Sequence, residues 1–193
     1  MENDKIMKLN VGCGLDYREG WINLDRDKDA NADVVFDLSK LSEREKLPFS
    51  DNYFERIIMF DVLEHFFDPL PILKELYRVC KIGGTIEIKV PYGVNSVKAL
   101  EHRRIFVLGS FNTHSFETTH SDAGVIRLNI KEIRIYSQLS SETFLGKFKK
   151  FYYNFFLSFI NLLIKRSVAF YDDTFLNRLL PNTNIYAKYV KVK

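Results

Sequence analysis

The stretch KLNVGCGLDYREGWINLD, which runs from Lys8 to Asp25, decides the fold predicted for this chain. It begins as a strand that ends at Val11 and then breaks on Gly12 and Gly14. Glycine accepts positive φ angles and lets a ligand come close to backbone N–H groups. A second short run ends on Asp25, where a carboxylate can accept hydrogen bonds from both hydroxyls of a ribose. The stretch therefore predicts two strands and a glycine turn that together form a nucleoside site.

Strands and helices are expected to alternate along the rest of the chain. Strands are predicted at residues 6–11, 21–24, 33–36, 54–60, 85–91, 125–139 and 184–193. Between the fourth and fifth of them, Leu70, Leu73 and Leu76 recur at helical spacing, and Gly83 with Gly84 is expected to close that helix. This order predicts an α/β fold: a Rossmann-like, mostly parallel seven-stranded sheet flanked by helices, with a helical insertion before the last strand.

Acidic residues end three consecutive predicted strands. They are Asp25, Asp37 and Asp61. In open α/β sheets the ligand lies beyond the carboxyl ends of the strands, so these carboxylates are expected to surround it. For Asp61, a role as the cap of the following helix is an equal alternative.

Two classes of nucleotide cofactor compete for the glycine turn. A dinucleotide fingerprint requires a third glycine three residues after the second one. Here Gly14 is followed by Leu15, Asp16 and Tyr17, and the next glycine is Gly20. The spacing disfavours a nicotinamide- or flavin-dependent oxidoreductase.

The segments LNVGCG, INLD, LPFSDNYFERIIMFDVLEHFFDP and ILKELYRVCKIGGTIEIKVPY support the other class. In this order and spacing they resemble the class I S-adenosylmethionine-dependent methyltransferases, in particular the type 11 group, over residues 8–92. The chain looks like a short variant, because the ten residues between Gly14 and Asp25 leave no room for the usual first helix and a strand. The resemblance implies S-adenosyl-L-methionine as the cofactor.

The resemblance also implies where the cofactor binds. Gly12, Cys13 and Gly14 would line its methionine part, and Asp25 would hold the ribose hydroxyls. The remaining cofactor-binding positions lie beside the adenine or in the wall after the fourth strand: Asp37, Leu38, Phe60, Asp61 and Val62. Asn10 stands where the family usually has an acid and is counted with the cofactor-binding residues.

Histidines supply the catalytic candidates. The resemblance puts His65, with Glu64, at the mouth of the site near the reactive methyl group. Imidazole is a natural base near neutral pH, and His114 in an irregular segment is a second candidate. The spacings among His102, His114 and His120 match no familiar metal-binding pattern, and no metal site is expected.

The length and the two cysteines indicate one domain in a reducing compartment. The 193 residues fit a single methyltransferase-like domain, with an irregular substrate-side segment at 93–124 and an aromatic-rich helical insertion at 143–180. Cys13 and Cys80 form no disulfide framework, and the charged N-terminus has no signal-peptide pattern. A cytoplasmic location is expected.

The C-terminal part of the chain is basic and aromatic. Residues 147–193 carry nine Lys and Arg against two Asp, and FYYNFFLSFINLLI at 151–164 has no charge. A helix there could pack on the core, pair with a second copy in a homodimer, or lie on the inner face of a membrane through residues 147–166. Nucleic-acid binding is disfavoured, because the basic residues form no dense patch.

Taken together, the residues and the resemblance predict a methyltransferase. The expected reaction is methyl transfer from S-adenosylmethionine to a small or lipid-linked acceptor, with a sugar hydroxyl as a candidate. The alternative is a methyltransferase-like binding module with weak or no catalysis, which Asn10 and the shortened loop motivate.

Overall fold

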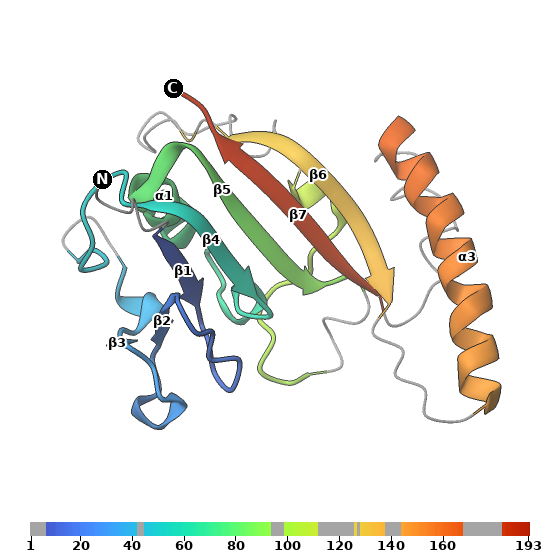
Figure 1. Ribbon diagram of the computed structural model, residues 1–193, viewed down its shortest axis with the longest axis horizontal. Helices are drawn as coiled ribbons and strands as arrows, with labels where there is room; N and C mark the ends of the chain where they lie inside the picture. The colour runs from blue at the N-terminus through green and yellow to red at the C-terminus, as the bar shows by residue number, and fades with distance from the viewer. Residues whose placement is uncertain are drawn as a thin grey trace.

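The computed structural model describes residues 7–41, 45–93, 99–111, 126, 128–137, 144–167 and 183–193. Within these residues a seven-stranded sheet has the order β3-β2-β1-β4-β5-β7-β6 (Figure 1). The strands are β1 (Lys8–Val11), β2 (Ile22–Asp25), β3 (Val34–Val35), β4 (Phe54–Phe60), β5 (Cys80–Pro91), β6 (Leu128–Ser137) and β7 (Thr183–Lys191). The pairs formed among β1 to β5 are parallel, and β7 lies antiparallel between β5 and β6. The predicted mostly parallel α/β sheet is confirmed.

The connection from β1 to β2 contains no helix, as its length predicts. Asn10 holds this connection in place, because its Nδ2 donates a hydrogen bond to the carbonyl of Asp16 at 2.7 Å and to Oδ1 of Asn23 at 3.1 Å. Asn23 in turn accepts a hydrogen bond from the backbone N–H of Arg18 at 2.9 Å. Two buried amide side chains therefore replace the helix that would otherwise order this segment.

Helix α1 (Leu70–Val79) is shorter than predicted. The sequence placed its end at Gly83 and Gly84, but the chain turns into β5 at Cys80. The glycines serve the strand instead. Gly83 has φ of +80°, and a Cβ on Gly84 would lie only 2.9 Å from the Cys80 Sγ, so the irregular pairing with β4 requires glycine there.

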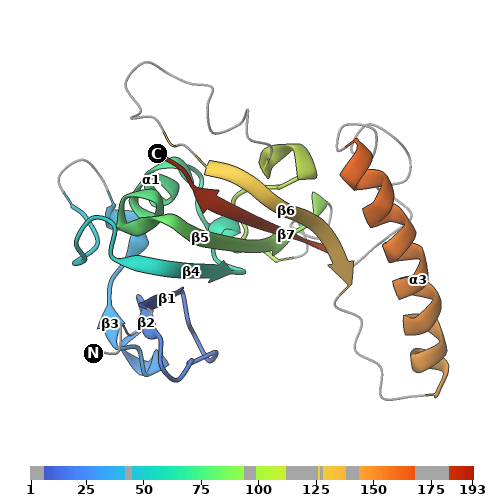
Figure 2. The same ribbon diagram turned by 45° about the horizontal axis from the view of Figure 1, so that its top comes forward.

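The two faces of the sheet differ in polarity. Ile57, Ile86 and Ile88 point to the face that shares an apolar cluster with Ile72 and Leu76 of α1. In the views of Figures 1 and 2, α1 lies on one side of the sheet. The core that supports the strand ends therefore lies on that side.

The opposite face carries paired charges. The carboxylate of Glu87 on β5 is buried and accepts hydrogen bonds from Arg56 on β4, at 2.9 and 3.0 Å, and from Lys188 on β7, at 3.0 Å. Beside them, the ring of Trp21 lies 5.4 Å from the Arg56 guanidinium and 5.6 Å from the Lys8 ammonium. Among the described residues, each of these side chains therefore has an oppositely charged or aromatic neighbour on this face of the sheet.

Helix α3 (Phe144–Arg166) lies beside the outermost strand, β6 (Figure 1). Asn161 attaches it: Nδ2 donates to the carbonyl of Ile135 and Oδ1 accepts from the N–H of Ile135, each at 2.9 Å. Leu157, Ile160 and Ile164 are buried. Core packing, one of the three roles considered for this segment, is thus confirmed for one side of α3.

The other side of α3 is apolar and exposed. Phe155, Phe159 and Leu162 are 72%, 53% and 64% exposed. In the part of the chain that the structure describes, no helix is long and apolar enough to cross a membrane. Parts of the predicted segments 93–124 and 143–180, including residues 112–124 and 168–180, lie outside the described residues.

Candidate functional site

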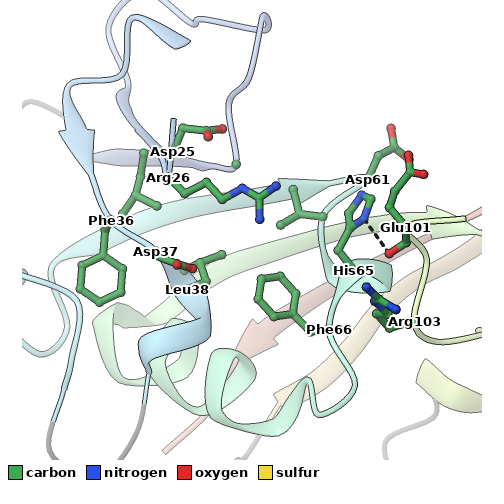
Figure 3. Close-up of a pocket in the computed structure, with 13 residues that line it drawn as sticks. Asp25, Arg26, Phe36, Asp37, Leu38, Asp61, His65, Phe66, Glu101 and Arg103 are labelled. Atoms are coloured by element: carbon green, nitrogen blue, oxygen red, sulfur yellow. Dashed lines mark hydrogen bonds between the residues drawn. The ribbon is translucent and has the colours of Figure 1, made fainter. Parts of the chain in front are cut away.

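A cavity of about 490 Å³ lies at the carboxyl ends of β1, β2 and β4 (Figure 3). A volume of this order suits a nucleoside-sized ligand. It is lined by Gly12, Leu24, Asp25, Arg26, Phe36, Asp37, Leu38, Asp61, Val62, His65, Phe66, Glu101 and Arg103. The cavity therefore occupies the edge of the sheet at which the three strand-end acids were expected to meet.

The glycine turn curls over the end of β2. The backbone N–H groups of Gly12 and Cys13 both donate to the carbonyl of Leu24, at 2.7 and 3.0 Å. The N–H of Gly14 donates to Oδ2 of Asp25 at 2.8 Å. Gly12 has φ of +68° and Gly14 has φ of +47°, which explains why glycine occupies both positions.

Two carboxylates border the cavity on the side of β2 and β3. Asp25 Oδ1 accepts from the N–H of Asp27 at 2.9 Å, so both carboxylate oxygens are oriented by backbone groups. Asp37 accepts from the N–H of Ser39 at 2.9 Å and caps the 3-10 helix η2 (Leu38–Lys40). That hydrogen bond lowers the pKa of Asp37, and the nearby Arg26 cation lowers it further.

Apolar side chains lie between these acids. Phe36 and Leu38 line the cavity on either side of Asp37 (Figure 3). A flat base can pack against such groups while carboxylate oxygens accept hydrogen bonds from its amine and from ribose hydroxyls. This end of the cavity therefore fits an adenosine.

Asp61 and His65 border the opposite end. Asp61 follows β4 with φ of +55° and forms an ion pair with Lys89 of β5. The side chain of Asp61 does not cap the following 3-10 helix η3 (Leu63–His65). The N-cap residue of η3 is Val62, and no side-chain hydrogen bond caps the helix. His65 Nδ1 lies 3.4 Å from the carbonyl oxygen of Glu101. Among the described lining residues His65 carries the only imidazole, and the segment at 99–105 contacts it.

Glu64 lies directly behind His65 and is 1% exposed. Burial raises the pKa of its carboxyl to about 7. The backbone carbonyl of Glu64 accepts from the N–H groups of Arg103 and Arg104, at 2.8 and 3.2 Å, which fixes the segment at 99–105 over η3. Neither carboxylate oxygen of Glu64 has a hydrogen-bond partner among the described residues.

The structure brings together seven of the residues that the sequence placed at the site. They are Gly12, Asp25, Asp37, Leu38, Asp61, Val62 and His65. Four other predicted site residues do not line the cavity. Asn10 and Cys13 are buried, Gly14 is engaged with Asp25, and the Phe60 ring lies between Arg18 and Lys89 on the charged face of the sheet. His114 lies outside the described residues.

Six lining residues were missed in the sequence. Arg26 and Phe36 adjoin predicted site acids, so their position in the chain was an available signal. Leu24 and Phe66 lie next to other predicted site residues, but their apolar side chains indicate core positions in the sequence. Glu101 and Arg103 come from a segment without periodicity or motif, and only the fold brings them to the cavity.

Comparison with known proteins identifies the N-terminal part of the chain. Residues 7–88 match the family described as "Methyltransferase domain". The chain is also 31% identical, over 137 residues, to the "Ubiquinone/menaquinone biosynthesis C-methyltransferase UbiE" of Neisseria meningitidis and to its counterpart in Neisseria gonorrhoeae. The alignment includes 60% of this chain and spans about half, 51%, of the length of these relatives.

Solved structures share the fold over nearly the whole chain. A SAM-dependent methyltransferase from Archaeoglobus fulgidus has a TM-score of 0.50 at 18% identity, with 97% of this chain and 86% of that one covered. The YcgJ protein from Bacillus subtilis has a TM-score of 0.53 at 16% identity, with 98% and 93% covered. Residues 7–88 are therefore similar to a methyltransferase domain, and the solved structures show that the chain shares their α/β fold.

Proposed function

We propose that this protein transfers a methyl group from S-adenosylmethionine to a hydroxyl group of a small or lipid-linked acceptor, with a sugar hydroxyl as the first candidate. The observation that carries the proposal is the order of groups along one cavity. Carboxylates and apolar side chains suited to adenosine lie at one end, and the imidazole of His65 lies at the other. A cofactor laid along this line would point its reactive end toward His65.

Each part of the cofactor would meet groups of matching chemistry. Asp25 would accept hydrogen bonds from the ribose hydroxyls through lone pairs that its backbone donors leave available. Phe36 and Leu38 would pack on the adenine, and Asp37 would accept from its amine. S-adenosylmethionine supplies an electrophilic methyl group on a sulfonium, so the protein has to align the acceptor and remove its proton.

His65 is the proposed proton acceptor. A proton on Nδ1 that faces the Glu101 carbonyl leaves Nε2 with its lone pair available to an acceptor hydroxyl. A base positioned in this way typically contributes a factor of about 10² to 10⁴ to the rate. Glu64 and the segment at 99–105 would hold the ring in place from behind.

The name of the Neisseria relatives brings in a second acceptor class. Their printed activity is C-methylation in ubiquinone and menaquinone biosynthesis. A quinone precursor therefore belongs in any acceptor panel beside free and lipid-linked sugars. The competing proposal is a binding module, which Asn10 favours: its side chain is committed to the β1–β2 connection rather than to a ligand.

Calorimetric titration with S-adenosylhomocysteine tests the site. We expect micromolar binding that weakens at least about 10-fold in Asp25→Asn, because a charge-assisted hydrogen bond contributes about 1.5–3 kcal/mol. Asp29→Asn, an exposed acid in the next turn, is the control and should bind like the wild type. Release of S-adenosylhomocysteine from S-adenosylmethionine in the acceptor panel then tests turnover. Binding without turnover on every acceptor class would favour the binding module, and no binding would refute the methyltransferase proposal.

A further inference from the structure

We propose that Glu64, His65 and His102 form a binding site for a divalent first-row transition-metal ion at the mouth of the cavity. The three residues come from two segments, η3 and the stretch at 99–105, that meet over the carboxyl end of β4. One ligand atom from each residue lies within 4.8 Å of the other two. Nothing in the family match or in the names of the relatives assigns a metal here.

Glu64 supplies the first line of support. Of the four buried side-chain atoms without a hydrogen-bond partner among the described residues, two are its carboxylate oxygens. A buried carboxylate needs a cation, a hydrogen-bond donor or a proton, because an unpaired charge away from water is strongly disfavoured. Its Oε1 lies 3.9 Å from Nε2 of His102, which is too far for a hydrogen bond.

The arrangement of the imidazoles supplies the second line. The rings of His65 and His102 lie edge to face, with their centroids 5.0 Å apart. Nitrogen and oxygen ligands lie about 2.0–2.2 Å from a zinc-like ion, so ligand atoms around it are separated by roughly 3–4 Å. The three groups therefore need to close by only about 1 Å, and the side chain of His65 is exposed.

The donor set selects the kind of ion. Two imidazoles and one carboxylate suit Zn²⁺, Fe²⁺, Co²⁺ or Mn²⁺ better than Mg²⁺ or Ca²⁺, which prefer oxygen ligands. Three protein ligands leave further coordination positions open, as in catalytic rather than structural sites. His65 also lines the cavity, so the open positions would face the acceptor.

This inference deepens the proposed function and, in its role toward the acceptor, rests on it. A bound ion would lower the pKa of an acceptor hydroxyl that coordinates it, so that the hydroxyl would give its proton to water near neutral pH. In that case His65 acts as a ligand rather than as the base. An oxygen acceptor able to coordinate the ion is then the expected substrate class.

Binding of Co²⁺ to the 193-residue chain loaded with S-adenosylhomocysteine tests the inference. We expect one equivalent to bind, with a visible absorption spectrum typical of nitrogen and oxygen ligands. Glu64→Gln and His102→Gln should each weaken binding at least about 100-fold, since even indirect partners of metal ligands change affinity 10- to 100-fold. Glu64→Gln removes a buried charge but keeps the shape of the side chain. A thermal unfolding transition verifies that the variant is folded.

One control makes the outcome decisive. Glu55→Gln alters a partly exposed carboxylate that is paired with Lys81, away from the proposed cluster. This variant should bind Co²⁺ like the wild type. Equal Co²⁺ affinity in Glu64→Gln and the wild type, or no stoichiometric binding at all, would overturn the metal site. Because S-adenosylhomocysteine binding is titrated on the same samples, loss of the metal site and loss of the cofactor site are told apart.

Discussion

Gly12 faces Val62 so closely that a methyl group on its Cα would lie 2.3 Å from Cγ2 of Val62. The contact joins the turn after β1 to the residue that follows Asp61, and both residues line the cavity. The close approach, together with the positive φ of Gly12, makes glycine necessary at this point of the turn.

Gly12→Ala should therefore destabilise the protein and weaken S-adenosylhomocysteine binding. The left-handed backbone costs about 1–2 kcal/mol for a non-glycine residue, and displacement of Val62 adds about 1–3 kcal/mol. Gly20→Ala is the matched control, because Gly20 has φ of +75° but open space around its Cα. The difference between the unfolding free energies of the two variants in urea gives the contribution of the clash with Val62. Equal free energies of unfolding would contradict the predicted clash.

Asn161→Ala should detach part of α3 from the edge of the sheet. The substitution removes two hydrogen bonds to the backbone of Ile135 and leaves that peptide group without its partner. We expect the free energy of unfolding to fall by about 2 kcal/mol. Ser158→Ala on the exposed side should change it by less than about 0.5 kcal/mol. Hydrogen exchange at the Ile135 amide should speed up in Asn161→Ala, and unchanged exchange would argue against this attachment.

Acid should weaken the protein partly through Glu87. Burial alone would raise the pKa of this carboxyl, but the hydrogen bonds from Arg56 and Lys188 outweigh burial and hold it below its ordinary value. A carboxyl whose pKa is depressed by folding stabilises the protein above its unfolded pKa, and this stabilisation is lost as the pH falls through the folded value.

Comparison of the wild type with Glu87→Gln checks this assignment. At pH 7 the variant should be less stable by roughly 2 kcal/mol, since hydrogen bonds to a charged group are replaced by weaker ones. As the pH falls below about 4.5, the ordinary glutamate pKa, the two unfolding free energies should converge. A difference between them that stays constant down to pH 2.5 would show that Glu87 does not titrate with folding.

The exposed side of α3 is proposed to contact a membrane surface. Phe155, Phe159 and Leu162 form an apolar stripe, and Lys165 lies exposed at its end. Such a helix binds anionic vesicles through apolar burial and basic side chains. Flotation with vesicles that contain anionic lipid should recover the wild type but not Phe155→Ser/Phe159→Ser. If the wild type fails to float and instead sediments as a dimer that the double variant abolishes, the stripe joins two copies of the chain.

The sequence by itself determined the strands, the glycine turn and the order of the site acids. Local patterns suffice for these, because alternation, glycine and strand-end carboxylates act within a few residues. The same local reasoning failed at Gly83 and Gly84. A glycine pair after a helical run favours a helix end, and only the packing of Gly84 against Cys80 and Glu55 reveals that it belongs to a strand.

The tertiary structure alone decided which residues meet at the far end of the cavity. Glu64 and His102 are 38 positions apart, and no spacing rule links them. The sequence comparison of His102 with His114 and His120 therefore did not include His65, the histidine that lies next to His102 in the fold. The hydrogen bonds of Glu87 with Arg56 and Lys188, and those of Asn161 with Ile135 on β6, likewise depend on strand order. Contacts between distant segments follow from burial of the whole core, which no single stretch of sequence encodes.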